Sequence, residues 1–345
     1  ETLFVRVRSR SGHVGWGESG ADAIMAGETL AGMVAMIEQH LRTPLLGASP
    51  FDHDRLETAF SRVYANGGAK SAVLMAVLDL AGKLGGKPVV ELLGGAVRRR
   101  ALVLRVIGGS ADLDADVAEA LALQREGFRA FKLKVGVAEL EREIETVAAL
   151  RRALGPTAAI AVDANMAWDV ASARRFARGV AAFAVNFIEQ PVASADFEGL
   201  AQVAEASPAP VGADEAVHGD QDIERLAARG GASGLSLKAA KFGGLAALVR
   251  AATLAQARGL RVNLAMLVES PLATAAIVHA ACALPAVDWG VSLGSLWVSE
   301  SPAVADLESV GGEVIRGDGP GLGVTVDEGT LRGFMAPGFD WGGAS

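Results

Sequence analysis

The sequence predicts an α/β protein in which a (β/α)7β TIM-like barrel carries a separate α+β lobe. Two observations support this fold class. Short apolar segments that end in a charged residue alternate with segments whose apolar residues recur at helical spacing. The charged positions from Lys134 to Lys238 follow one another at intervals of 24 to 29 residues, about the length of one strand, one helix and two loops.

Residues 1–95 are predicted to form the α+β lobe. A strand is expected at 2–9 (TLFVRVRS) and a turn at 11–18 (SGHVGWGE). Helical periodicity follows in three segments, at 28–41, 52–64 and 69–86.

The barrel is expected over residues 96–310. Helical patterns occupy residues 140–154, 169–183, 196–206, 220–230 and 244–259. The strands around them, with further strands expected at 101–109, 261–267 and 287–293, make eight, which is enough to close a parallel barrel. Residues 311–345 are glycine-rich and too short for a domain, so we expect them to return to the first lobe.

Charged side chains end five successive strands of this pattern. They are Lys132 and Lys134 in FKLKVG, Asp163 in VDAN, Glu189 in FIEQP, Asp214 in GADE and Lys238 in LSLKAAK. Burying an ionised side chain costs several kcal/mol unless it is paired or bound to a metal. Because the carboxyl ends of barrel strands hold the active site, these residues predict one shared site.

The three carboxylates suit a hard divalent cation. Asp163, Glu189 and Asp214 supply oxygen ligands from adjacent strands, which favours Mg²⁺, or Mn²⁺, completed by water and substrate oxygens. Zinc is disfavoured because the five histidines are scattered and none ends a strand. The alternative for each acid is that it caps the following helix.

The lysines predict acid and base chemistry. Lys132 and Lys134 point to the same face of their strand, and we expect their repulsion to lower the pKa of the deeper one, making a general base. Lys238 is expected on the opposite side of the barrel. Such a pair could remove a proton next to a metal-bound carboxylate and return it from either face. The alternative is that the lysines only neutralise the acids as ion pairs.

The motif Lys132-Leu133-Lys134, the three acids and Lys238 in LKAAKFGG together resemble the enolase superfamily, muconate lactonizing enzyme subgroup (the mandelate racemase/muconate lactonizing enzyme family). The resemblance spans nearly the whole chain. It implies a barrel with a capping domain whose loops close over the substrate, and a homo-oligomer. It also implies that the family's first strand and specificity loop precede Glu1. Ser292 stands where muconate cycloisomerases are expected to carry a Glu, and VSLGSLW lacks the acidic motif of dipeptide epimerases.

These features predict a Mg²⁺-dependent racemase or epimerase of an amino-acid derivative, N-acylated or proline-like. Muconate-type cycloisomerisation, and dehydration of a β-hydroxy acid or hydroxyproline, are the alternatives that keep the same site. A catalytically silent barrel used as a binding module is an alternative from another class. The residues expected to contact a small carboxylate substrate are Tyr64, Asn165, Glu269, Ser292 and Trp297, with Asn66 and Lys70 beside Tyr64.

Composition limits the binding partners and the cellular compartment that we expect for the protein. A net charge of −8 argues against a nucleic-acid-binding surface. The sequence shows neither a signal peptide nor a long apolar span, so we expect a cytoplasmic enzyme without membrane association. Cys282 is the single cysteine, which excludes an intrachain disulfide.

Overall fold

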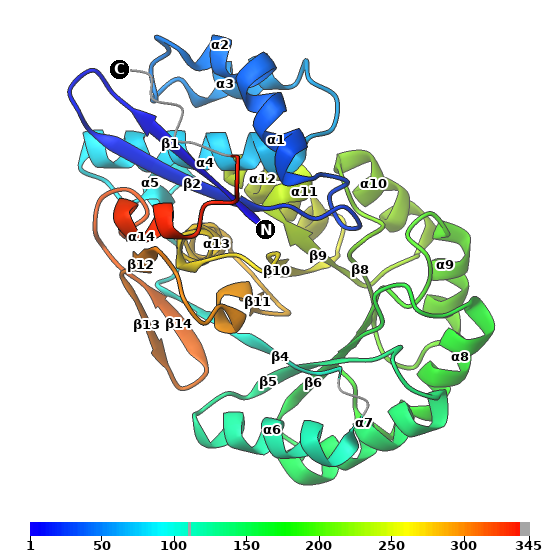
Figure 1. Cartoon of the computed structure of the whole chain (residues 1–345). Coiled ribbons are helices and arrows are strands. Elements are labelled where there is room, and N and C mark those ends of the chain that lie inside the picture. Colours follow the sequence, from blue (N-terminus) through cyan, green and yellow to red (C-terminus); the bar gives the residue numbers. More distant parts are fainter. Residues whose placement is uncertain (110–111, 339–345) are drawn as a thin grey trace.

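The computed structural model describes residues 1–109 and 112–338, and its largest element is an eight-stranded parallel barrel (Figure 1). The strands lie in the order β11-β10-β9-β8-β7-β6-β5-β4, and a parallel bridge between Val103 and Val291 closes the ring. The predicted fold class is confirmed. The strands are β4 (Leu104–Gly108), β5 (Ala130–Lys134), β6 (Ala159–Asp163), β7 (Phe187–Glu189), β8 (Val211–Ala213), β9 (Gly234–Lys238), β10 (Arg261–Ala265) and β11 (Val291–Ser292).

Helices surround the ring of strands because each has an apolar stripe to bury (Figure 1). In α7, for example, Val147, Leu150 and Leu154 are buried, while Arg142, Glu145 and Arg152 are exposed. The first helix, α6, was not predicted. The barrel helices are α6 (Leu113–Arg125), α7 (Leu140–Leu154), α8 (Val170–Gly179), α9 (Phe197–Ala206), α10 (Asp220–Arg229), α11 (Ala239–Phe242), α12 (Leu245–Ala257) and α13 (Pro271–Ala283), with the 3₁₀ turn η2 (Ala181–Phe183).

One end of the barrel interior is filled by aromatic rings. Phe187 and Trp289 stack with their centroids 3.9 Å apart. Gly212 and Gly234 leave room for the indole, since a Cβ on either would lie 2.9 or 2.5 Å from the Trp289 ring. This packing closes the end of the barrel opposite the polar strand ends, so access to those polar groups is from the carboxyl end.

The smaller lobe is a two-stranded antiparallel sheet packed on a long helix. β1 (Thr2–Arg8) pairs with β2 (Val14–Gly20), so the turn predicted at 11–18 is wrong beyond His13. β2 crosses α4 (Gly67–Gly85) at Gly15 and Gly17, where any Cβ would overlap the helix backbone. The remaining elements of this lobe are α1 (Leu30–Met36), the π-helix η1 (Ile37–Leu41), α2 (Arg42–Leu45), α3 (His53–Phe60) and α5 (Val89–Leu92).

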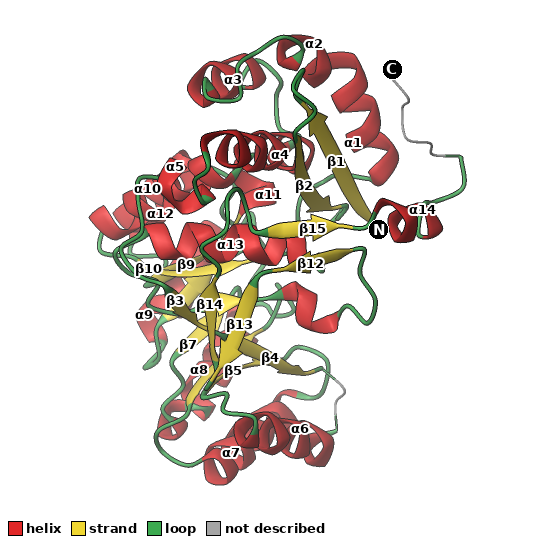
Figure 2. Cartoon of the chain, turned by 90° about the vertical axis from the view of Figure 1, so that its left-hand side faces the viewer, coloured by secondary structure: helices red, strands yellow, loops and turns green. Residues whose placement is uncertain are grey.

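The C-terminal elements run from the side of the barrel to the smaller lobe (Figure 2). Arg6 of β1 forms an ion pair with Glu328 at 2.8 Å, and the Leu322 amide donates to buried Asp79 of α4. These elements are η3 (Gly294–Trp297), β12 (Ala303–Ala305), β13 (Leu307–Val310), β14 (Glu313–Arg316), β15 (Val324–Val326) and α14 (Glu328–Gly333), and β14 also pairs with β3 (Arg100–Leu102).

No helix within residues 1–109 and 112–338 combines the length and the apolar character needed to cross a membrane.

Candidate active site

The six charged residues predicted from strand ends lie at the carboxyl end of the barrel. We call Asp163, Glu189 and Asp214 the strand-end carboxylates, and Lys132, Lys134 and Lys238 the strand-end lysines. β5, which carries two of the lysines, and β9, which carries Lys238, are separated by three strands on either side of the ring. Lys134 and Lys238 therefore approach the middle of the barrel from opposite sides.

Each strand-end carboxylate is paired with a lysine. Lys132 Nζ lies 2.9 Å from Glu189 Oε2 and 3.8 Å from Asp163 Oδ2. Lys134 Nζ lies 2.7 Å from the same Asp163 oxygen, and Lys238 Nζ donates to Asp214 Oδ2. The helices that follow are capped by other residues, Asp169 for α8 and Asp196 for α9, and Gly219 precedes α10. The strand-end carboxylates are thus not helix caps.

A fourth lysine, which the sequence analysis did not single out, contacts Asp214 of the cluster. Lys241 Nζ donates to Asp214 Oδ1 and to its backbone oxygen, both at 2.6 Å. Its side chain is completely buried. It lies in α11, three residues after Lys238, and that second lysine in LKAAK was the available signal.

The expected lowering of the pKa of the deeper KxK lysine is wrong for this arrangement. Burial favours a lower pKa for Lys132, but the carboxylates of Glu189 and Asp163 outweigh it and raise the pKa above its ordinary value. Lys238 behaves in the same way, because burial is outweighed by Asp214. The prediction failed because it counted the repulsion between lysines and left out the nearer acids.

The lysines compensate Glu189 only in part, through its oxygen Oε2. Burial, and then repulsion from Asp163, raise the pKa of Glu189 to about 7. Glu189 Oε1 is buried and has no hydrogen-bond partner. A buried carboxylate oxygen without a donor is where a cation would be accommodated, and three hard oxygen donors suit a divalent ion.

The predicted metal ligands do not lie close enough together in this arrangement to hold an ion. Within the described ranges, no three acidic, histidine or cysteine side chains lie close enough together to hold an ion. The lysine ammonium groups lie between the strand-end carboxylates and act as their counter-charges. The oxygen donors suit a divalent cation by their chemistry, but binding one would require the lysines to withdraw from the carboxylate oxygens.

Asn165, which was predicted to contact substrate, lies beside the cluster and links it to a residue that the sequence analysis missed. Its Oδ1 accepts from Lys134 Nζ at 2.6 Å, and its Nδ2 donates to Glu215 Oε1 at 2.9 Å. Its backbone amide donates to Asp163 Oδ1 at 3.0 Å. Glu215 directly follows a metal-ligand candidate in GADE, where it reads as part of a turn.

Glu269, which was predicted to contact substrate, connects the smaller lobe to the barrel. Its Oε1 accepts from the Gly20 amide at 2.8 Å, and its Oε2 accepts from the Leu267 amide at 3.1 Å. Reciprocally, Glu18 of β2 accepts from the Ser270 amide and hydroxyl at the start of α13. Oε1 of Glu269 therefore holds the lobe against the barrel, while Oε2 is bonded within the barrel's own loop after β10.

The other residues predicted to contact substrate differ in how exposed they are. Ser292 is buried at the end of β11, level with Lys238, because both pair with Ala265 of β10. Trp297 lies in η3 and is 50% exposed. Tyr64 is 93% exposed, so the structure does not place its ring in the cluster.

The residues beside Tyr64 are engaged within the smaller lobe. Asn66 donates to the Tyr64 backbone oxygen, and Lys70 donates to the Val63 backbone oxygen. The lobe reaches the site through Met25 instead, whose sulfur lies 3.8 Å from Lys238 Nζ.

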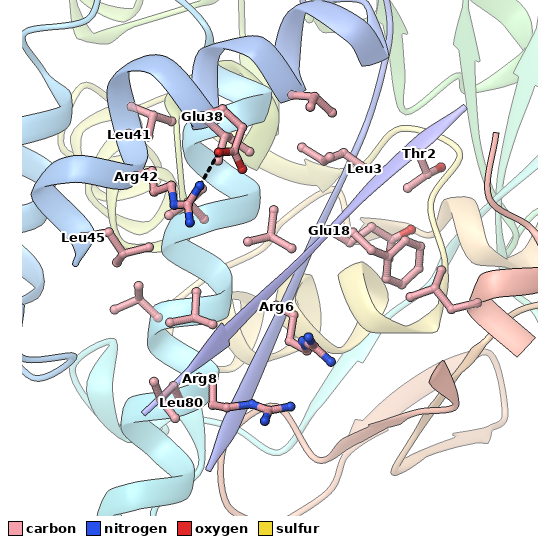
Figure 3. Close-up of a pocket in the computed structure, with 18 of the residues that line it drawn as sticks. Thr2, Leu3, Arg6, Arg8, Glu18, Glu38, Leu41, Arg42, Leu45 and Leu80 are labelled. Carbon is pink, nitrogen blue, oxygen red and sulfur yellow. Dashed lines mark hydrogen bonds and ion pairs between the residues drawn. The ribbon is translucent and has the colours of Figure 1, made fainter. Parts of the chain in front are cut away.

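A cavity lies away from the strand ends. It has a volume of about 1190 Å³ and runs along β1, between the strand and helices α1 and α4 (Figure 3). Leu3, Leu41 and Leu45 contribute apolar walls, and Arg6 and Arg42 contribute charge. None of the strand-end residues lines it.

The closed parallel barrel, the capping lobe and the buried Lys/Asp/Glu cluster define a capped barrel enzyme whose charged groups lie at the carboxyl ends of the strands. Comparison with known proteins identifies the family. Residues 1–94 match the mandelate racemase/muconate lactonizing enzyme N-terminal domain, and residues 115–330 match the enolase C-terminal domain-like family. The chain belongs to the mandelate racemase/muconate lactonizing enzyme family of the enolase superfamily, and it is a metal-dependent isomerase.

Curated relatives include enzymes with two different activities. Muconate cycloisomerase 1 of Pseudomonas putida is 35% identical, over 96% of this chain and 90% of the relative. The N-succinyl-L-Arg/Lys racemase of Bacillus cereus is 26% identical, over 96% and 89%. Among solved structures, muconate lactonizing enzyme from Pseudomonas putida has a TM-score of 0.92 at 33% identity, covering 96% of this chain and 94% of that chain.

Proposed function

We propose that the chain is a cycloisomerase that interconverts a conjugated, muconate-like dicarboxylate and its lactone. This was the alternative to racemisation in the sequence analysis, and the similarity to muconate cycloisomerases now favours it. The observation that carries the proposal is Lys134. It is the most accessible of the strand-end lysines, with its side chain 28% exposed against 5% for Lys132 and 7% for Lys238.

In the lactonising direction, one carboxylate oxygen of the substrate adds to the carbon that is β to the other carboxylate, at one end of a C=C bond. The π electrons move to the carbon next to the other carboxylate, and the Lys134 ammonium gives its proton to that carbon. A C–O bond and a C–H bond form while a C=C π bond and an N–H bond break. Partial exposure allows Lys134 to recover its proton from solvent.

Asp163, Glu189 and Asp214 would hold a divalent cation, most simply Mg²⁺. When bound, such an ion neutralises the negative charge that develops on the substrate carboxylate. Lys238 would approach the substrate from the other side and add positive charge there. Met25 of the capping lobe lies over Lys238 and helps to exclude water from that side.

Racemisation of an N-acyl amino acid is the second candidate, and Ser292 favours it. The site presents a neutral hydroxyl where muconate cycloisomerases are expected to carry a carboxylate. Lys134 and Lys238 face each other from opposite sides of the barrel, as two-base racemisation requires. The racemase relative shows that such chemistry occurs within the same family.

Lysine variants separate the two candidates. Purified enzyme with Mg²⁺ would be incubated with cis,cis-muconate, muconolactone and N-succinyl amino acids, and products followed by NMR and chiral chromatography. A cycloisomerase should lose at least about 100-fold in kcat with Lys134→Met and much less with Lys238→Met. A racemase should lose racemisation with either substitution. Absence of turnover of every compound by wild type would refute both proposals.

A further inference from the structure

The side-chain amide of Asn165 bridges a cation and an anion from different strands. It accepts from the Lys134 ammonium at 2.6 Å and donates to the Glu215 carboxylate at 2.9 Å. An ammonium only donates and an ionised carboxylate only accepts. Only one of the two amide orientations therefore satisfies both neighbours. The reversed amide would place its NH₂ against Lys134 and its oxygen against Glu215.

The backbone around Glu215 is fixed by its neighbours. The buried side-chain oxygen Oε1 of Gln190 accepts from the amides of Asp214 and Ala216, on either side of Glu215. A ring nitrogen of His218 lies 3.0 Å from the Glu215 backbone oxygen. The carboxylate is thus carried on a backbone that has little freedom to move.

The Glu215 side chain is directed at Asn165. The residue is only 4% exposed, and within the described residues its single side-chain hydrogen bond is the one to Asn165 Nδ2. Its second oxygen, Oε2, is buried without a partner. A buried carboxylate with one hydrogen bond is costly to keep, so a role for that one bond is worth testing.

Lys134 has the most need of such support. Because its side chain is partly exposed, packing alone leaves several rotamers of this long side chain accessible. Two acceptors hold the ammonium, Asp163 Oδ2 at 2.7 Å and Asn165 Oδ1 at 2.6 Å. If Asp163 turns to a bound cation, Asn165 becomes the remaining acceptor.

We propose that Glu215 is a positioning residue for Lys134. By holding Asn165 Nδ2, it keeps Asn165 Oδ1 aimed at the ammonium and so fixes Lys134 for proton transfer. This inference rests on the proposed function, in which Lys134 is the proton donor.

Two substitutions of Glu215 separate its hydrogen bond from its charge. Glu215→Gln keeps an oxygen acceptor for Asn165 and removes the charge, whereas Glu215→Leu removes both. Glu215→Leu should lower kcat by about 100-fold, the effect of roughly 1 Å of misplacement of a reacting group, with little change in KM. Glu215→Gln should stay within about fivefold of wild type, because the amide orientation is preserved.

A double variant tests whether Glu215 acts through Asn165. Asn165→Leu alone removes the acceptor for Lys134, so adding Glu215→Leu should cause no further loss of kcat. Asp79→Asn is the matched control for the loss of a buried acid. Asp79 lies in α4 and accepts from the Trp16 and Leu322 amides, so this variant should lower Tm while leaving kcat of the folded enzyme unchanged.

Lysine acetylation followed by mass spectrometry gives a readout that needs no substrate. Lys134 should be modified faster in Glu215→Leu than in wild type, and at the wild-type rate in Glu215→Gln. Failure of wild type to turn over substrate would refute the proposed function but leave this result to decide the inference. The inference is overturned if Glu215→Gln is as impaired as Glu215→Leu, if the double variant is additive, or if the acetylation rate of Lys134 is the same in all three proteins.

Discussion

Replacing each lysine of the KxK motif by methionine should separate stability from activity. Lys132 is 5% exposed and pairs with Glu189, which is fully buried and already has one oxygen without a partner. Lys132→Met leaves that carboxylate uncompensated, a change that costs about 3 to 5 kcal/mol. Lys134 is 28% exposed, and after its loss Asp163 keeps Lys132 at 3.8 Å, so Lys134→Met should cost less than about 1 kcal/mol.

The loss of activity in the two variants should not follow the same order as their loss of stability. Loss of a general acid lowers the rate by about 100- to 10,000-fold, which corresponds to about 2.7 to 5.5 kcal/mol of barrier. Lys134→Met should therefore be a folded but inactive protein.

Urea unfolding of the metal-free protein, in the presence of a chelator, measures the stability difference. Adding Glu189→Gln to Lys132→Met should recover much of the loss, because the buried charge is removed. Lowering the pH from about 8 to about 5 should also narrow the gap between Lys132→Met and wild type, because a protonated Glu189 needs no cation. Equal destabilisation by the two methionine variants, or full activity in Lys134→Met, would refute this reasoning.

Three further predictions concern the lobe contact, the packing of β2 and the metal. Burial, then repulsion from Glu269, raise the pKa of Glu18 to about 8, so the folded protein keeps a proton that the unfolded chain releases above about pH 4.5. Stability should therefore fall as pH rises through that window, and Glu18→Gln should flatten the fall in a Tm-versus-pH series; an unchanged slope would contradict it. Gly17→Ala should destabilise by at least about 1 to 3 kcal/mol in urea, because its Cβ would overlap the Ala72 carbonyl oxygen. Mg²⁺ should raise Tm, by an amount equivalent to about 2.7 kcal/mol at one hundred times its Kd, and Asp214→Asn should abolish the rise; an equal rise in that variant would place the ion elsewhere.

The barrel and the strand-end cluster were predictable because charge at the end of an apolar strand is costly and therefore informative. Lys241 and Glu215 were not, because each lies one turn or one residue beyond a predicted site residue and its partner comes from a different strand. Their roles depend on hydrogen bonds that only the folded barrel brings together.

The contacts between the lobes were beyond prediction for a related reason. Glu18 and Ser270 are 252 residues apart in sequence, and neither lies in a recognisable motif. The exposure of Tyr64 could not be predicted, because a loop sequence does not indicate which way its side chains point. The lysine pKa direction was wrong because it depends on distances between strands.

The most direct test of the central claim is proton exchange in D₂O with Mg²⁺, followed by NMR and mass spectrometry on muconolactone and N-succinyl amino acids. The claim is that the strand-end cluster moves a proton on the carbon next to a carboxylate. Deuterium at that carbon, lost with EDTA and in Lys134→Met but kept in the Asp79→Asn control, is the predicted result. Exchange that persists in Lys134→Met, or no exchange with any compound, would contradict the claim.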